Sequence, residues 1–144
     1  MSGRIEDIQI KDPNPEEDFF EHKVVPQIAR RFSVSYHGNY KVVKTDATFY
    51  PNGEETEGEI KQDVLVLVQR GTSPPHLHGD LINATIIEIP VKTAAVNIQH
   101  AESFLRELGL EHHINAVGGL YSYNPEMREK AASHEIGQIG YSWH

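Results

Sequence analysis

The stretch IIEIPVKTAAVNIQHAESFLRELGLEHHINAVGG, residues 86–119, decides the fold. It opens with an apolar strand that Pro90 ends, continues with a short strand over residues 94–97, and then changes to the spacing of a helix. The apolar residues of this helix share one face, at Ala101, Phe104, Leu105 and Leu108. A strand over residues 114–117 completes a strand–helix–strand unit whose connection is long enough to join parallel neighbours.

The ends of the predicted elements carry their own signals. Asn97 is placed to cap the start of the helix, and Gly109 followed by Leu110 favours a left-handed stop at its end. Asn124-Pro125-Glu126 predicts the start of a second helix, because Asn caps, Pro fits the first helical position and Glu meets the positive end of the dipole. A third parallel strand is expected to begin at Ile139.

The first half of the chain has mostly strand patterns. Residues 32–43 alternate around Gly38-Asn39, which predicts a hairpin, and VLVLV at residues 64–68 predicts a strand buried on both faces. Residues 1–18 are expected to form an extended polar leader. Residues 19–28 could form a short helix, which a proline would interrupt.

Composition narrows the class of protein. The 144 residues suit one domain with a core, and the net charge of −8 disfavours nucleic acid as a partner. There is no cysteine, which excludes thiolate metal sites and cysteine nucleophiles. No stretch approaches the roughly 18 apolar residues of a membrane span, and the N-terminus lacks the pattern of a signal peptide.

Four segments in a fixed order carry a family resemblance. Residues 86–119, together with FSVSYHGNYKVVK (32–44), VLVLVQRG (64–71) and YSYNPEM (121–127), resemble the first lobe of helical-backbone periplasmic binding proteins. These are the substrate-binding components of ABC importers for iron siderophores, haem and cobalamin. The resemblance covers about residues 30–144.

The resemblance implies a fold and a function. The fold is a three-layer Rossmann-like lobe with a mainly parallel central sheet, preceded by an N-terminal β-hairpin region, and residues 19–144 would form this single lobe. Such proteins have two lobes joined by a long helix and are about twice this length, so the chain corresponds to the first lobe. It would bind a ferric siderophore, haem or cobalamin without an intrinsic cofactor or catalysis. Its partner would be an ABC permease, at a periplasmic or extracytoplasmic location.

Ligands of open parallel sheets bind at the carboxyl ends of the strands, which selects the candidate ligand-binding residues. They lie at three places near the ends of predicted strands: Asn97, Gln99 and His100 at the junction of strand and helix; Tyr121, Ser122 and Tyr123 after the glycines; and Tyr141 and Trp143 after the last strand. Aromatic rings with a polar tip suit large flat ligands. The alternatives are that Asn97 only caps a helix, that His100 is solvated, that the tyrosines pack at an interface, and that the terminal residues fray.

Two other functions remain open. His76-Leu77-His78 resembles the histidine pair of some metallohydrolases, and His112-His113 adds a second cluster, although solvated loop histidines are the simpler interpretation. The acids Glu102 and Glu107 are interpreted as a solvated helix face. The third possibility is an interaction module, in which the lobe assembles with a second copy or another chain.

Overall fold

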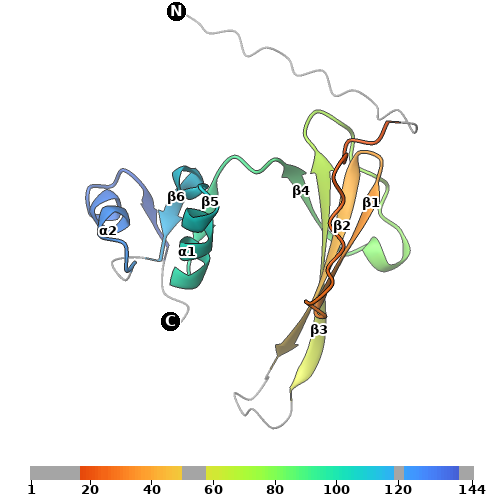
Figure 1. Ribbon diagram of the computed structural model, residues 1–144, viewed down its shortest axis with the longest axis horizontal. Coiled ribbons are helices and arrows are strands. Elements are labelled where there is room, and N and C mark those ends of the chain that lie inside the picture. Colours follow the sequence, from red (N-terminus) through yellow and green to blue (C-terminus); the bar gives the residue numbers. More distant parts are fainter. Residues whose placement is uncertain (1–16, 50–57, 119–121, 140–144) are drawn as a thin grey trace, which may run out of the picture. The chain divides into compact units, whose positions relative to one another are not determined.

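The computed structural model describes residues 17–49, 58–118 and 122–139. The chain divides into two compact units, Met1–Pro90 and Val91–His144, and each has its own sheet (Figure 1). The strands are therefore shared between two sheets, whereas the sequence predicted one central sheet in a single lobe. The mixed α/β content is as predicted.

The sheet of the first unit has four strands in the order β1-β2-β3-β4. Its elements are β1 (Phe32–His37), β2 (Tyr40–Phe49), β3 (Glu59–Gln69), the short 3-10 helix η1 (Gly79–Leu81) and β4 (Thr85–Ile89). The first three strands are antiparallel, and β4 runs parallel to β3. This sheet is therefore rich in antiparallel pairs.

The hairpin predicted around Gly38-Asn39 is confirmed. His37 pairs with Tyr40 across the turn, and Gly38 has a φ of 34°, which glycine adopts at low cost. The buried Asn39 side chain donates from Nδ2 to Thr72 Oγ1 at 2.8 Å and to the carbonyl oxygen of Ser73 at 3.0 Å. The turn therefore anchors the segment that follows β3.

The core of the first unit lies on one face of its sheet. Val42, Val66 and Val68 are buried there, and segment 71–84 covers them with Leu77, Leu81 and Ala84. Residues 64–68 form a strand as predicted, but Val64, Leu65 and Leu67 are only partly buried. The prediction of burial on both faces was wrong, because no second layer of the described residues covers the other face fully.

The segment before β1 forms no helix where a short one was considered at residues 19–28. It runs as an irregular chain tied to the hairpin, with the Phe19 amide donating to the Gly38 carbonyl oxygen at 3.0 Å and the Val24 amide to Tyr36 Oη at 2.8 Å. Of the predicted leader, residues 1–16 lie outside the described residues.

The second unit is a three-stranded parallel sheet in the order β5-β6-β7. Its elements are β5 (Ala94–Val96), α1 (Gln99–Glu107), η2 (Glu111–His113), β6 (Ile114–Val117), α2 (Pro125–Ala132) and β7 (Gly137–Gln138). The predicted strand–helix–strand unit is confirmed. The third strand begins at Gly137 rather than Ile139, and the Ile139 amide donates to the Val117 carbonyl oxygen at 2.9 Å.

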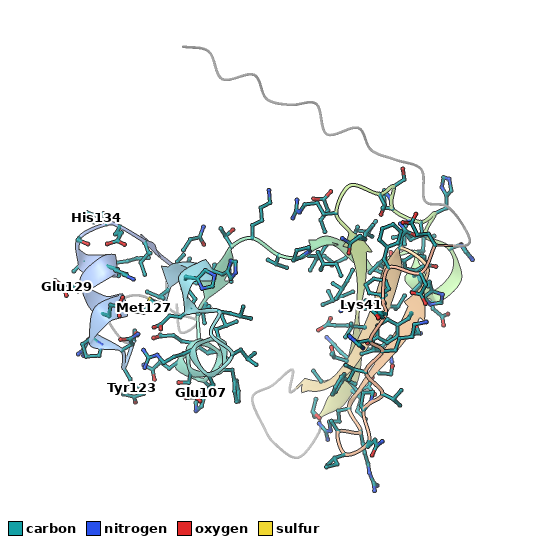
Figure 2. The ribbon with its side chains drawn as sticks, turned by 45° about the horizontal axis from the view of Figure 1, so that its top comes forward. Lys41, Glu107, Tyr123, Met127, Glu129 and His134 are labelled. Atoms are coloured by element: carbon teal, nitrogen blue, oxygen red, sulfur yellow. The ribbon has the colours of Figure 1, made fainter. Side chains whose placement is uncertain are left out.

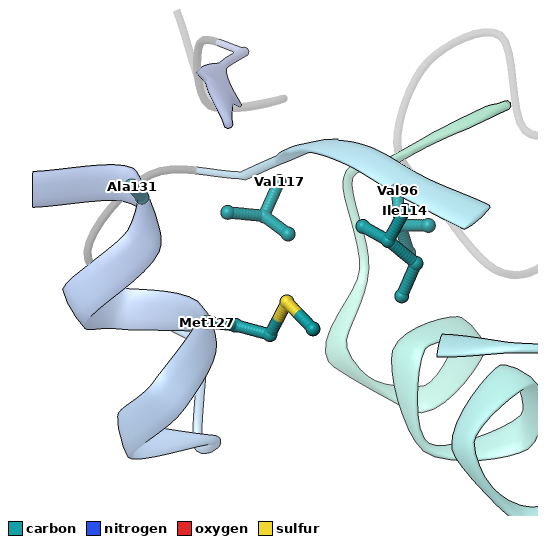
Figure 3. Packing of buried hydrophobic residues seen from close by; sticks show 5 residues of the cluster. All are labelled: Val96, Ile114, Val117, Met127 and Ala131. Atoms are coloured by element: carbon teal, nitrogen blue, oxygen red, sulfur yellow. The ribbon is translucent and has the colours of Figure 1, made fainter. Parts of the chain in front are cut away.

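Both helices of the second unit pack on one core cluster (Figure 3). Its buried members are Val96, Ile114, Val117, Met127 and Ala131, and Ala101 and Leu105 of α1 pack against them. The described residues thus supply one helical layer, and the three-layer arrangement is not confirmed. Phe104 and Leu108, predicted on the same helix face, are each 69% exposed.

The helix ends test three predictions. Gly109 has a φ of 71°, its amide donates to Arg106, and the Leu110 amide donates to Leu105, so the left-handed stop is confirmed. Asn124 caps α2 as predicted, accepting from the Glu126 amide at 3.0 Å. The cap predicted at Asn97 was wrong, because Ile98 occupies the capping position of α1 and offers no side-chain oxygen.

None of the helices in the described part of the chain is long and apolar enough to cross a membrane.

Candidate functional site

The carboxyl ends of β5 and β6 bring two residues into contact. A Cβ atom at Gly118 would lie 2.7 Å from the Asn97 carbonyl oxygen and 2.9 Å from Asn97 Oδ1. The Gly118 amide donates to the Val96 carbonyl oxygen at 3.0 Å. Asn97 is exposed, so its amide lies at the solvent-facing end of the parallel sheet. We call Asn97, Gly118 and the N-terminal turn of α1 the carboxyl edge.

A buried carboxylate lies in the turn of α1 beside this edge. Glu102 is 6% exposed and Ser122 is 4% exposed, with Ser122 Oγ at 2.8 and 2.7 Å from the two carboxylate oxygens. The hydroxyl donates its one proton to the carboxylate and accepts from the Asn124 amide at 3.1 Å. The expectation of a solvated Glu102 was wrong, since this hydrogen bond holds it inside the unit.

The hydrogen bonds around Glu102 and Ser122 continue through Asn124 to η2 and the end of α1. Asn124 Nδ2 donates to Glu111 Oε1 at 2.6 Å, and Arg106 Nη2 donates to the same oxygen at 3.2 Å. These bonds connect α1, η2 and the start of α2. On α2, the hydrogen bond from Lys130 lowers the pKa of the exposed Glu126 carboxyl, and the same bond raises the pKa of Lys130.

The structure places the predicted ligand-binding residues unevenly. Gln99 begins α1 and is partly buried, His100 is exposed beside it, and Tyr123 is 84% exposed before α2 (Figure 2). Ser122 is buried, and its hydroxyl is bound to Glu102 rather than turned to solvent. The remaining predicted residues lie outside the described residues: Tyr121, Tyr141 and Trp143.

The histidines that the structure describes do not form a cluster of the kind a metal requires. His76 and His78 are exposed, with His78 Nδ1 at 3.0 Å from the His76 carbonyl oxygen. The rings of His112 and His113 lie 4.1 Å apart, and His113 Nδ1 is 2.7 Å from the Lys92 carbonyl oxygen. Over residues 17–49, 58–118 and 122–139, no three His, Cys, Asp or Glu side chains gather into a ligand set.

Two residues of this region are not assigned to the site in the sequence interpretation: Glu102 is interpreted there as solvated, and Gly118 has no role. Glu102 lies three positions before Leu105, which places it on the buried side of α1, and that spacing was the available signal. Gly118 directly follows a predicted strand, but its contact with Asn97 depends on the pairing of β5 with β6.

Comparison of the chain with protein-family models, with curated proteins and with solved structures finds no match. Function is therefore inferred from the residues of the carboxyl edge and from the order of elements that builds it.

Proposed function

We propose that the chain is the first lobe of a substrate-binding protein of an ABC importer, and that it binds a ferric siderophore, haem or cobalamin. One observation supports this best: two parallel strands end side by side and hold the exposed Asn97 against Gly118. Ligands of open α/β sheets bind at such ends. In the proposal the unit belongs to a three-layer lobe, on the periplasmic or extracytoplasmic side, that delivers its ligand to an ABC permease.

The carboxyl edge offers three kinds of contact to a metal chelate. The amide of Asn97 and the ring of the exposed His100 can donate hydrogen bonds to chelate oxygens. The N-terminal turn of α1 adds a positive dipole end, which favours carboxylate or catecholate groups. Ile98 and Tyr123, 59% and 84% exposed, add apolar area for a large ligand. The binding involves no covalent step.

Titration with a ferric siderophore, with haem and with cobalamin tests the proposal. We expect saturable quenching of Tyr and Trp fluorescence by one of these chelates. Asn97→Ala and His100→Ala should each weaken binding about three- to tenfold, the effect of losing one hydrogen bond. Asn115→Ala is the matched control, because Asn115 is an exposed asparagine within β6 rather than at its end. If none of the three chelates binds, the proposed substrate class is wrong.

A specific observation also favours the interaction module as a second candidate. Phe104 of α1 and Leu108, the residue that caps the end of α1, lie four positions apart and are each 69% exposed, and Leu110 beyond the helix is 39% exposed. Single exposed apolar residues are ordinary, but three along one helix and its end suit a surface that another chain covers. The occupant in this proposal is a second copy or a separate lobe.

The mass of the protein in solution tests this second candidate. Sedimentation over a range of concentrations should show a dimer that Phe104→Asp converts to a monomer. Glu107→Asp provides the control, because Glu107 is an exposed residue of the same helix and this substitution leaves the charge at that position unchanged. A strict monomer at every concentration, together with no binding of any chelate, would exclude assembly between copies.

A further inference from the structure

The sheet of the first unit ends at β1, and the outer edge of this strand is open. β2 pairs with Phe32–His37 on one side, and no strand of the described residues pairs with the other side. The Asp46 amide donates to the Arg31 carbonyl oxygen at 2.8 Å, which fixes the alternation of the ladder. Residues 33, 35 and 37 therefore bond to β2, whereas residues 32, 34 and 36 direct their amide and carbonyl groups outward, where an added strand can bind them.

The segment before β1 contacts the hairpin without pairing with this edge. The Phe19 amide bonds to the carbonyl oxygen of Gly38 in the turn, and the Val24 amide bonds to the side-chain hydroxyl of Tyr36. Over the described residues 17–30, no backbone group bonds to the backbone of β1. Val24 remains 62% exposed and Val25 75% exposed. Apolar surface beside Tyr36 therefore accompanies the open edge.

The two edge strands of this sheet differ in their protection against pairing. β4, at the other edge, contains Glu88, which forms an ion pair with Arg70 at 2.6 Å, and Pro90 follows its last residue. β1 has the sequence FSVSYH, without an acid, a lysine, an arginine or a proline, and its register with β2 has no bulge. Charges, prolines and bulges are the features by which edge strands avoid pairing. β1 therefore has the composition of a strand that accepts a neighbour.

We propose that β1 pairs antiparallel with β1 of a second copy of the chain, about a two-fold axis at Val34. In this register Val34 pairs with its own copy and Phe32 pairs with Tyr36, so all the outward backbone groups of these residues are bonded. Ser33 lies opposite Ser35 on the other face. Aromatic, valine and hydroxyl pairs of this kind stabilise antiparallel sheets. The two four-stranded sheets would then form one continuous sheet.

The charges around β1 permit two copies to meet. Charge enters the proposed register only at its ends, where His37 lies opposite Arg31 of the second copy. Lys41 and Lys44 lie one strand further from the axis, on β2, and Lys44 approaches Asp80 at 3.6 Å. No two acids and no two lysines would therefore face each other across the axis. The proposal is independent of chelate binding and of the exposed residues of α1.

The backbone alternation gives a specific readout of this pairing. The full chain is diluted from about 1 mM to about 10 μM, because one pair of short strands is a small interface that forms a weak dimer. Sedimentation should show a dimer that dissociates on dilution. The amide NMR signals of residues 32, 34 and 36 should move with concentration, whereas those of residues 33, 35 and 37 are already bonded to β2 and should move less.

Salt separates this neutral edge from an interface made of ion pairs. The net charge of −8 makes two copies repel each other at long range, and salt screens that repulsion. Added sodium chloride at about pH 7.5, where histidine is mostly neutral, should therefore strengthen the dimer slightly. A dimer that salt weakens would mean that opposite charges hold the copies together, contrary to the proposal.

Charged variants of the exposed serines test the register. The double variant Ser33→Lys and Ser35→Lys places lysines opposite each other in two pairs, so its dimer dissociation constant should rise at least about tenfold. Ser33→Glu with Ser35→Glu should do the same. An equal mixture of the two double variants should restore the dimer, because each lysine then faces a glutamate. Thr93→Lys with Ser133→Lys is the matched control, since it adds the same charge at exposed positions of the second unit and should change nothing.

Three further outcomes would overturn the proposal. A strict monomer at about 1 mM would mean that the edge does not pair with itself. A dimer that Phe104→Asp abolishes and the double lysine variant retains would place the contact on α1. Loss of the dimer in both double variants without recovery in their mixture, with circular dichroism showing each variant folded, would exclude the register about Val34.

Discussion

Replacing Ser122 with alanine is expected to destabilise the second unit by about 2–4 kcal/mol, because it leaves a buried charge without its donor. Ser122 Oγ lies 2.7 and 2.8 Å from the oxygens of Glu102, which is only 6% exposed. The same oxygen accepts from the Asn124 amide, so the variant also removes that acceptor. Urea unfolding followed by the methyl NMR signals of Val96 and Val117 measures the loss in this unit.

A second substitution distinguishes the buried charge from a simple loss of packing. Adding Glu102→Leu to Ser122→Ala removes the unsatisfied carboxylate, so most of the lost stability should return. Ser122→Thr keeps the hydroxyl and is the conservative control. If the double variant is less stable than Ser122→Ala alone, Glu102 is held by groups other than Ser122, and the hydroxyl is not its principal partner.

The features that the sequence predicted correctly depend on residues close together in the chain. The Gly38-Asn39 turn needs only its two flanking strands, and the stop at Gly109 needs only the last turn of α1. The cap at Asn124 is an interaction with a residue two positions away. Local backbone chemistry is enough to specify such features.

The features that the sequence missed depend on which elements pack together. The helix pattern marked Phe104 and Leu105 alike, but only Leu105 meets the core, because the short strands of this sheet cover a narrow stripe of α1. Glu102 is buried because Ser122, twenty positions later, returns to it. The division into two sheets likewise depends on long-range pairing that periodicity does not encode.

The candidate site contains one residue that the sequence could identify from its local position and one that depends on the packing of distant segments. Asn97 was found because it follows a strand, which is a local property. Its predicted role as a cap was wrong, since the capping position of α1 lies one residue later, at Ile98. Gly118 gains its importance only from its contact with Asn97.

Replacing Met127 with alanine is expected to cost the second unit about 2–5 kcal/mol of stability, the range for emptying a well-packed core position. Met127 is 1% exposed and extends from α2 into the cluster that includes Val117 and Ile114 (Figure 3). It is one of the few large side chains in a small core. The neighbouring side chains are therefore too few and too small to move into the cavity that the substitution leaves. Urea unfolding read from the Val96 and Val117 methyl signals would again report the change.

Two further variants separate lost volume from lost helix. Met127→Leu nearly conserves the volume of the side chain and should cost less than about 1.5 kcal/mol. Arg128→Ala alters the exposed neighbour on the same helix and should change stability by less than about 0.5 kcal/mol. Because α2 contributes both Met127 and the buried Ala131, its packing on β6 should weaken before that of α1 does. Equal losses for Met127→Ala and Arg128→Ala would contradict a core that depends on Met127.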